Sequence, residues 1–134
     1  MCGIAGIMTS STAVPSDTVL DSLGQALAHR GPDGEGRYKS RGIGLVHTRL
    51  AIIDLETGDQ PITETSSADA KSTLIANGEI YNYPELTAAL DGVGFSTRSD
   101  CEPPLHLYRR HGLDFTDHLR GMYAIAIHDP EAGR

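Results

Sequence analysis

Glycine divides this chain into short segments whose apolar patterns change from strand-like to helical and back. The sequence has 15 glycines in 134 residues. Short apolar runs bounded by glycine and polar clusters are typical of strands. Such runs predict strands at residues 4–8, 42–53, 72–76 and 123–127. Because segments with helical spacing lie between them, the predicted fold class is α+β.

Three segments have the spacing of amphipathic helices. Apolar residues recur every three or four positions from residue 17 to about 29, with Ser16 as the expected N-cap. Pro84 suits the first turn of a second helix, which we expect to end at Gly92. A third helix is expected to begin after residue 99 and to end at Gly112.

Two of the strand regions carry further detail. The segment 42–53 is interrupted by His47-Thr48-Arg49, and residues 63–72 are polar and without periodicity, which predicts an exposed loop. The strand at 123–127 mixes small and large apolar residues, a pattern that favours burial on both faces.

Residues 129–134 have the composition of a tight turn, with proline early and glycine late. A turn after a strand predicts a returning strand, and the sequence supplies none. We therefore expect the chain to be a fragment whose last hairpin is incomplete. The alternative is a frayed tail, which would leave an apolar strand at a sheet edge.

Composition limits the classes of function. A chain of 134 residues fits one domain, and its formal charge of −7 argues against a nucleic-acid surface. No stretch reaches the apolar length of a membrane span, and the N-terminus lacks the pattern of a signal peptide. The two cysteines lie far apart in sequence, so we expect free thiols and a cytoplasmic protein.

Cys2 is the first candidate for chemistry. Removal of Met1 would place a thiol and a free α-amine on one residue, a nucleophile with its own base. An unperturbed thiol titrates near about 8.5 and an α-amine near about 7.7 to 8.0, so both can be partly reactive at neutral pH. The alternative is that Cys2 is a small buried hydrophobic residue at the start of a strand.

Two further motifs have two interpretations each. Asn77-Gly78 is typical of a tight turn, yet the amide and the glycine N–H can also direct two donors at one oxyanion. Arg49 interrupts an apolar run and either lies on a solvated strand face or binds a carboxylate with two hydrogen bonds.

The segment around Asp100 combines local structure with a candidate site. Ser99 and Glu102 have the spacing of a capping box, and Asp100 would be an acid in the first turn that could also bind an ammonium group. Pro103 and Pro104 disturb this pattern, because they would remove donors from the first turns. The helix then begins near Pro103 instead.

Other polar residues receive no catalytic role. The turn at residues 29–34 closes the first helix, with cationic residues near its C-terminus, and is interpreted as a structural corner. Cys101 is interpreted as incidental. We expect no metal site, because metal-ligand spacing is absent among the remaining histidines, His47, His106, His111, His118 and His128.

Together these groups are what hydrolysis of the side-chain amide of glutamine requires. In its motifs and in their order along the sequence, the chain resembles the glutaminase domain of class II glutamine amidotransferases. Within that group it resembles the asparagine synthetase branch. The resemblance rests on motifs along essentially the whole chain: residues 2–7, 29–34, 47–54, 77–82, 99–100 and 121–127. It implies the N-terminal-nucleophile hydrolase fold, a four-layer αββα sandwich of two antiparallel sheets.

The resemblance also implies roles for individual residues. Cys2 would be the nucleophile and its α-amine the base, while Asn77 and Gly78 would form the oxyanion hole. Arg49 would bind the α-carboxylate of glutamine and Asp100 its α-ammonium group. The remaining contacts to glutamine would come from Glu79 and from the backbone at Ile52 and Ile53.

The same resemblance implies a partner that this chain lacks. In the family enzyme, ammonia passes to a synthetase domain that uses ATP and Mg to activate aspartate, and residues 1–134 contain no glycine-rich phosphate loop. We expect no cofactor in this domain. Two alternatives are an amidotransferase that supplies ammonia to another acceptor and an inactive remnant.

Overall fold

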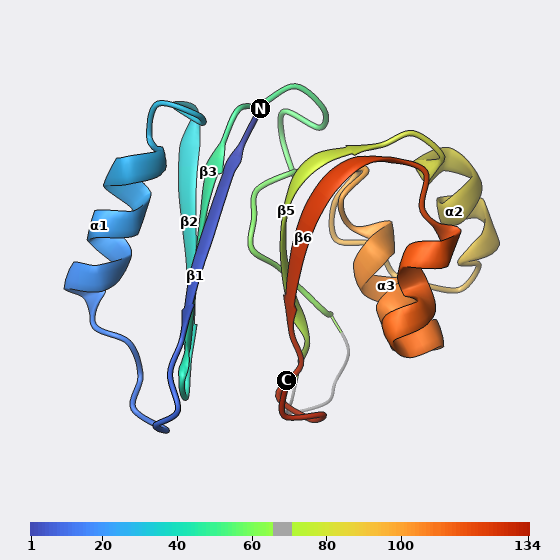
Figure 1. Cartoon of the computed structure of the whole chain (residues 1–134). Coiled ribbons are helices and arrows are strands. Elements are labelled where there is room, and N and C mark those ends of the chain that lie inside the picture. The colour runs from blue at the N-terminus through green and yellow to red at the C-terminus, as the bar shows by residue number, and fades with distance from the viewer. Residues whose placement is uncertain (66–70) are drawn as a thin grey trace.

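The computed structural model describes residues 1–65 and 71–134. Two three-stranded antiparallel sheets stack face to face, with helices on both outer faces, so the molecule has four layers (Figure 1). The predicted αββα sandwich is confirmed. Within the described residues, no helix has the length and apolar character needed to cross a lipid bilayer.

The first sheet has the strand order β1-β3-β2 and is covered by one helix. Thr48 Oγ1 donates a hydrogen bond to the Leu27 carbonyl oxygen at 3.1 Å, so this face of β3 lies toward α1. Because side chains alternate along a strand, Leu45, His47 and Arg49 face the other sheet. The elements of this half are β1 (Gly3–Met8), α1 (Asp17–Leu27), β2 (Gly34–Ser40) and β3 (Ile43–Arg49).

The second sheet has the order β4-β5-β6, with β5 in the centre. Leu74 and Ala76 of β5 pack with Cys101 and Leu105 on the helical side. Asn77 therefore faces the first sheet. The elements of this half are β4 (Ile62–Thr63), β5 (Thr73–Ile80), α2 (Tyr83–Ala89), α3 (Pro103–His111), the 3-10 helix η1 (Gly112–His118) and β6 (Gly121–His128).

Several predicted elements are confirmed, with shifted ends. The first helix ends at Leu27, two residues earlier than expected, and Ser16 is its N-cap residue without a side-chain hydrogen bond. The helix at Pro84 and the helix that ends before Gly112 are present. Strand β2 was not predicted, because its sequence alternates glycine with polar residues and has no apolar run.

Two predictions in the middle of the chain are wrong. His47, Thr48 and Arg49 do not interrupt β3 but form its buried end, because they lie between α1 and the second sheet. The loop expected at 63–72 is not exposed throughout: Thr63 is exposed but pairs in β4, whereas Glu64 and Ser72 are buried. Residues 66–70 of that loop lie outside the described residues.

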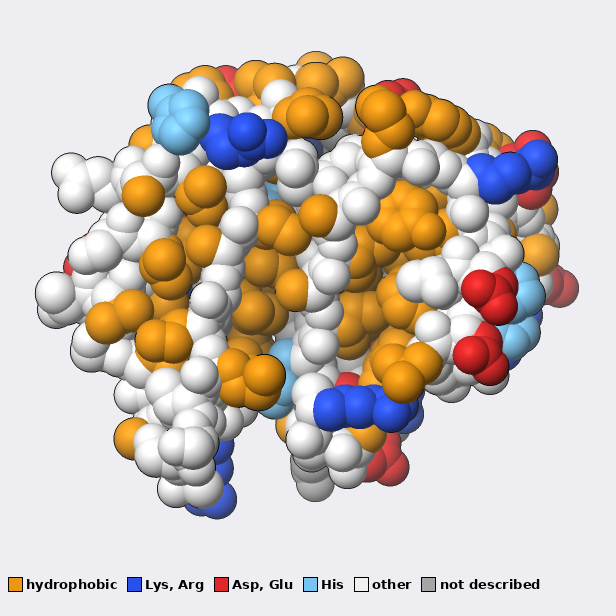
Figure 2. All heavy atoms as spheres, in the orientation of Figure 1, with side chains coloured by type: hydrophobic (Ala, Val, Ile, Leu, Met, Phe, Trp, Pro, Cys, Tyr) orange, Lys and Arg blue, Asp and Glu red, His pale blue; other side chains and the backbone are white. Residues whose placement is uncertain are grey.

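The last strand also differs from the prediction. β6 pairs only with β5 among the described strands, and Met122 and Tyr123 are 58% and 36% exposed, so burial on both faces is wrong. Figure 2 shows hydrophobic side chains gathered along the exposed edges of β1 and β6. The tight turn after β6 is confirmed by two hydrogen bonds, in which the backbone N–H groups of Asp129 and Arg134 donate to each other's carbonyl oxygens.

Candidate functional site

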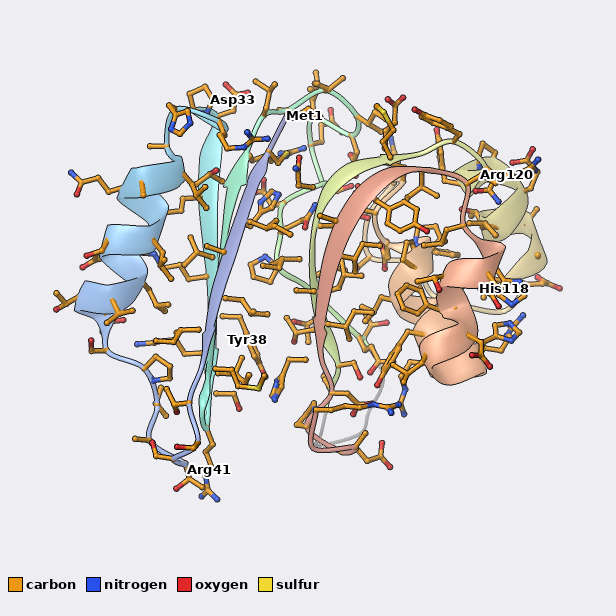
Figure 3. All side chains as sticks on the ribbon, in the orientation of Figure 1. Met1, Asp33, Tyr38, Arg41, His118 and Arg120 are labelled. Atoms are coloured by element: carbon orange, nitrogen blue, oxygen red, sulfur yellow. The ribbon has the colours of Figure 1, made fainter. Side chains whose placement is uncertain are left out.

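A cavity of about 110 Å³ lies where the N-terminus, the end of β3 and the middle of β5 meet. Figure 3 shows Met1 at this end of the sandwich, whereas Tyr38 and Arg41 lie toward the other end. The cavity brings together all eight residues selected from the sequence: Cys2, Arg49, Ile52, Ile53, Asn77, Gly78, Glu79 and Asp100.

Cys2 lies at the edge of the cavity, directly before β1, and is partly buried. Its Sγ atom accepts a hydrogen bond from the Leu50 backbone N–H at 3.3 Å and lies 3.6 Å from the Leu50 carbonyl oxygen. Arg30 Nε donates to the Cys2 carbonyl oxygen at 3.1 Å. Arg30, which the sequence analysis placed in a structural corner, thus holds the backbone of the candidate nucleophile.

Met1 still precedes Cys2 and is itself part of the cavity lining. Met1 is 63% exposed. The nitrogen of Cys2 is an amide in this form of the chain and becomes an amine only when Met1 is removed.

The motif Asn77-Gly78 is not a turn. Both residues belong to strand β5, where they pair with Ala124 and Tyr123 of β6, so the turn interpretation is wrong. A Cβ atom at Gly78 would lie 2.1 Å from the Met122 carbonyl oxygen, so only glycine allows β6 to approach this closely. The tertiary pairing overrides the local preference for a turn and places the Asn77 side chain between the sheets.

Arg49 is buried at the end of β3, so the interpretation as a solvated strand face is wrong. Its Nη1 atom donates to Asp59 Oδ1 at 2.8 Å, and its Nη2 atom donates to the Asp54 carbonyl oxygen. A buried guanidinium requires such partners. The Asp59 side chain is 82% exposed, so this ion pair lies at the protein surface on one side.

Asp100 is 3% exposed, and its Oδ2 atom accepts the backbone N–H of Ile80 at 2.7 Å. The predicted capping box is wrong. Helix α3 begins at Pro103, because proline lacks an N–H and fits only the first turn. Glu102 is the N-cap residue, and its carboxylate accepts hydrogen bonds from Ser96 and Thr97 instead of capping the helix.

Asp54 was missed as a residue that organises the site. Its Oδ2 atom accepts the Arg98 backbone N–H at 2.7 Å, and its Oδ1 atom accepts the Thr57 backbone N–H at 3.0 Å. Its φ of 52° is left-handed, which is rare for a residue with a side chain. Asp54 thus connects the loop after Arg49 with the loop before Asp100. An aspartate three residues before a threonine is the turn pattern that could have revealed it.

The two cysteines have different environments. Burial, together with the charge of Asp100, raises the pKa of the Cys101 thiol to about 12. A thiol with such a pKa is almost entirely protonated at neutral pH and is therefore a poor nucleophile. Both cysteines line the cavity, but Cys101 is buried, whereas Cys2 is only partly buried and its Sγ atom accepts the Leu50 backbone N–H.

His47 is a second residue of the cavity lining whose pKa is strongly shifted. Burial lowers its pKa to about 4, although the backbone of Ala76 acts in the opposite direction. The imidazole is therefore neutral at physiological pH, and it lines the same cavity as Cys2 and Asn77.

Comparison with known proteins gives one consistent result. Residues 1–134 match the family model described as a glutamine amidotransferase domain. The chain is 39% identical over 132 residues to the glutamine-hydrolyzing asparagine synthetase 2 of Bacillus subtilis, a match that covers 96% of this chain and 17% of the relative. It is 43% identical over 136 residues to a probable asparagine synthetase of Dictyostelium discoideum, covering 98% and 24%.

A solved structure supports the fold. The glutamine phosphoribosylpyrophosphate amidotransferase of B. subtilis superposes with a TM-score of 0.71 at 23% identity, over 96% of this chain and 35% of that chain. The chain thus spans less than a quarter of the length of these curated relatives and about a third of that amidotransferase.

Proposed function

Because the chain belongs to the glutamine amidotransferase domain family, we propose that residues 1–134 form a glutaminase domain that hydrolyses L-glutamine to glutamate and ammonia. The observation that carries the proposal is the meeting of Cys2, Arg49, Asn77 and Asp100 at one cavity. These residues come from four separate segments of the chain. They supply a nucleophile and an amide donor for the side-chain amide of glutamine, a cation for its α-carboxylate and an acid for its α-ammonium group.

The proposed reaction begins after removal of Met1. The free α-amine of Cys2 takes the thiol proton, and the sulfur attacks the side-chain amide carbon, so that a carbon–sulfur bond forms and the carbonyl oxygen becomes an oxyanion. Asn77 Nδ2 and the Gly78 backbone N–H donate to that oxyanion. The tetrahedral adduct then collapses. The α-ammonium group of Cys2 gives its proton to the leaving nitrogen, the carbon–nitrogen bond breaks, and ammonia departs, which leaves a thioester on Cys2.

Water completes the cycle. The α-amine takes a proton from a water molecule, whose oxygen attacks the thioester carbon, and the carbon–sulfur bond breaks. Glutamate leaves, and the α-ammonium group of Cys2 returns its proton to the sulfur, which restores the thiol. The contact between Cys2 Sγ and the Leu50 backbone N–H supports this scheme, because it holds the sulfur atom beside the cavity in which the substrate would bind.

Substrate recognition follows from the charges in the cavity. The Arg49 guanidinium binds the α-carboxylate of glutamine, and the buried Asp100 carboxylate binds its α-ammonium group. Glu79 and the backbone of Ile52 and Ile53 complete the contacts. The hydrogen bond from Ile80 to Asp100 Oδ2 supports this assignment, because it leaves Oδ1 for the substrate.

The ammonia has a proposed destination as well. The similarity to glutamine-hydrolyzing asparagine synthetases supports a role in which a synthetase domain or subunit uses ATP and Mg to amidate aspartate with this ammonia. The setting would then be the cytoplasm, where ATP is available. No nucleic acid or membrane takes part in this proposal.

The test combines intact mass with a diazo-ketone analogue of glutamine. We expect the purified chain to lack Met1 and to gain one adduct, and we expect Cys2→Ala to gain none. Cys101→Ala is the matched control and should still be labelled, because that buried thiol is unreactive. Glutamate release from glutamine, measured on the same samples, should be detected in the variants that are labelled and absent in Cys2→Ala.

Each other outcome has a definite meaning. An adduct on Cys2→Ala would refute the assignment of the nucleophile. A chain that has lost Met1 but gains no adduct would refute a competent glutaminase site. Retained Met1 would mean that the α-amine of Cys2 is never released, and the proposed mechanism would then fail for this chain.

A further inference from the structure

Two buried polar groups in the cavity have no partner among the described residues. His47 is 1% exposed, and neither Nδ1 nor Nε2 of its ring makes a hydrogen bond of normal geometry, although the ring lies close enough to the Ala76 backbone for that group to raise its pKa. Oδ1 of Asn77 is likewise buried and unpaired. Buried polar atoms in folded proteins are almost always hydrogen-bonded, so unpaired atoms require an explanation. Burial of each such atom without a partner would cost stability.

The two groups lie on facing strands. His47 projects from β3 toward the second sheet, on the same side as Arg49, and Asn77 projects from β5 toward the first sheet. Both line the cavity that also contains Cys2. The neighbouring Gln60 is already engaged, since its Oε1 atom accepts the Ala76 backbone N–H at 2.6 Å.

Their hydrogen-bonding capacities are complementary. A neutral imidazole has one N–H donor and one acceptor, and the oxygen of an asparagine amide only accepts. Burial keeps His47 neutral, with a pKa of about 4, so its ring carries one donor at physiological pH. No direct hydrogen bond joins the two side chains, and a water molecule between polar groups in a cavity of about 110 Å³ can bridge them.

We propose that His47 is a positioning residue for Asn77: its ring N–H, through one bridging water, satisfies Asn77 Oδ1 and thereby turns Nδ2 of the amide toward the oxyanion. The proposal rests on the proposed glutaminase function. Orientation matters because an amide rotated by half a turn would present its oxygen to the oxyanion, which would repel it instead of stabilising it. His47 itself does not touch the substrate.

The kinetic test compares His47→Leu with His47→Gln. Leucine fills the site but removes the donor, so we expect kcat for glutamine hydrolysis to fall by about 10- to 100-fold. This decrease is smaller than the decrease expected when an oxyanion-hole donor is itself removed. KM should change by less than about twofold, since the charged contacts to glutamine remain. Glutamine at position 47 keeps a neutral donor and should retain most of the wild-type kcat.

Stability provides a second measurement. The proposed water pairs the ring N–H with Asn77 Oδ1, so loss of that donor in His47→Leu should lower the unfolding midpoint, and His47→Gln, which keeps a donor, should restore it. A wild-type kcat in His47→Leu, an effect confined to KM, or a His47→Gln variant as slow as His47→Leu would each overturn the proposal. His118→Gln, at an exposed histidine remote from the cavity, is the control.

A readout without catalysis distinguishes this inference from the proposed function. The side-chain amide signals of Asn77 in an NMR spectrum, identified by their loss in Asn77→Asp, should shift in His47→Leu and stay in place in His118→Gln. If wild-type protein hydrolyses no glutamine, the proposed function fails. The NMR comparison then still decides whether His47 positions Asn77, since an unmoved amide signal would overturn that link.

Discussion

Glu102 is the buried acid on which the loop before Asp100 depends, and Glu102→Gln is the most informative single change for the fold of the site. The carboxylate is 1% exposed. It accepts the backbone N–H and the hydroxyl of Ser96 at 2.8 and 2.9 Å, and the same two groups of Thr97 at 2.6 Å each. Four donors thus hold residues 96 and 97, which lie four and three positions before Asp100.

The size of the stability loss in Glu102→Gln follows from these hydrogen bonds. In the glutamine variant one carboxylate oxygen becomes an NH2 group that faces a backbone N–H, which then has no acceptor. Such a loss costs about 1–3 kcal/mol, and the bonds that remain lose the strength conferred by a charged acceptor. We expect the free energy of unfolding at pH 7 to fall by about 2–4 kcal/mol. The substrate L-glutamine should also bind more weakly to this variant, because Asp100, which contacts it in the proposed site, directly follows this loop.

The pH dependence provides an independent check. Burial alone would raise the pKa of Glu102, but hydrogen bonds from His106, Ser96 and Thr97 lower it from 4.5 to about 2. This depression corresponds to about 3 kcal/mol, at about 1.4 kcal/mol per pKa unit. The contribution is complete above the unfolded pKa of about 4.5 and is lost as the pH falls toward 2. The wild-type advantage over Glu102→Gln should therefore shrink across that range.

Urea unfolding at several pH values between 7 and 2.5 measures this difference. Glu56→Gln, at an exposed acid in another loop, is the control and should change the free energy of unfolding by less than about 0.5 kcal/mol. A Glu102→Gln variant that loses less than 1 kcal/mol at pH 7, or loses the same amount at pH 7 and pH 3, would refute the reasoning.

Three further changes test other contacts. Gly78→Ala should lower the unfolding free energy by several kcal/mol, because its Cβ would lie 2.1 Å from the Met122 carbonyl oxygen; equal midpoints in urea would contradict this. Asp54→Ala removes the acceptor of the Arg98 N–H and should weaken binding of glutamine, measured by calorimetry on Cys2→Ala protein, by about tenfold; unchanged affinity would argue against its linking role. Arg30→Ala should slow labelling of Cys2 by the diazo-ketone by about tenfold, with unlabelled protein equally stable, and an unchanged labelling rate would show that its bond to the Cys2 carbonyl oxygen is dispensable.

Local patterns predicted the elements that depend on neighbours in sequence. The first helix follows from its apolar spacing and ends within two residues of the expected position. The start of α3 at Pro103 follows from the missing N–H of proline, and the chemistry of that residue outweighs the capping-box spacing of Ser99 and Glu102. Strand β2 gave no signal, because its edge position requires no apolar run.

The candidate site residues came from motif order, and local preference alone would have misplaced two of them. Asn77-Gly78 has the composition of a turn but continues β5, because pairing with β6 satisfies its backbone. Arg49 has the charge of a surface residue but is buried between β3 and the loop that contains Asp54 and Asp59. In each case residues distant in sequence decide the conformation.

The sequence by itself therefore determined which chemical groups are available: a thiol at position 2, an amide followed by glycine, an arginine and an acid, each in a short segment of predictable type. The tertiary structure decided that they share a cavity, that Arg30 and Asp54 hold the segments in place, and that His47 is neutral beside Asn77. The physical reason is the distance along the chain over which each effect acts. Propensity and spacing act over a few residues, whereas burial, strand register and electrostatic environment depend on segments brought together only when the two sheets stack.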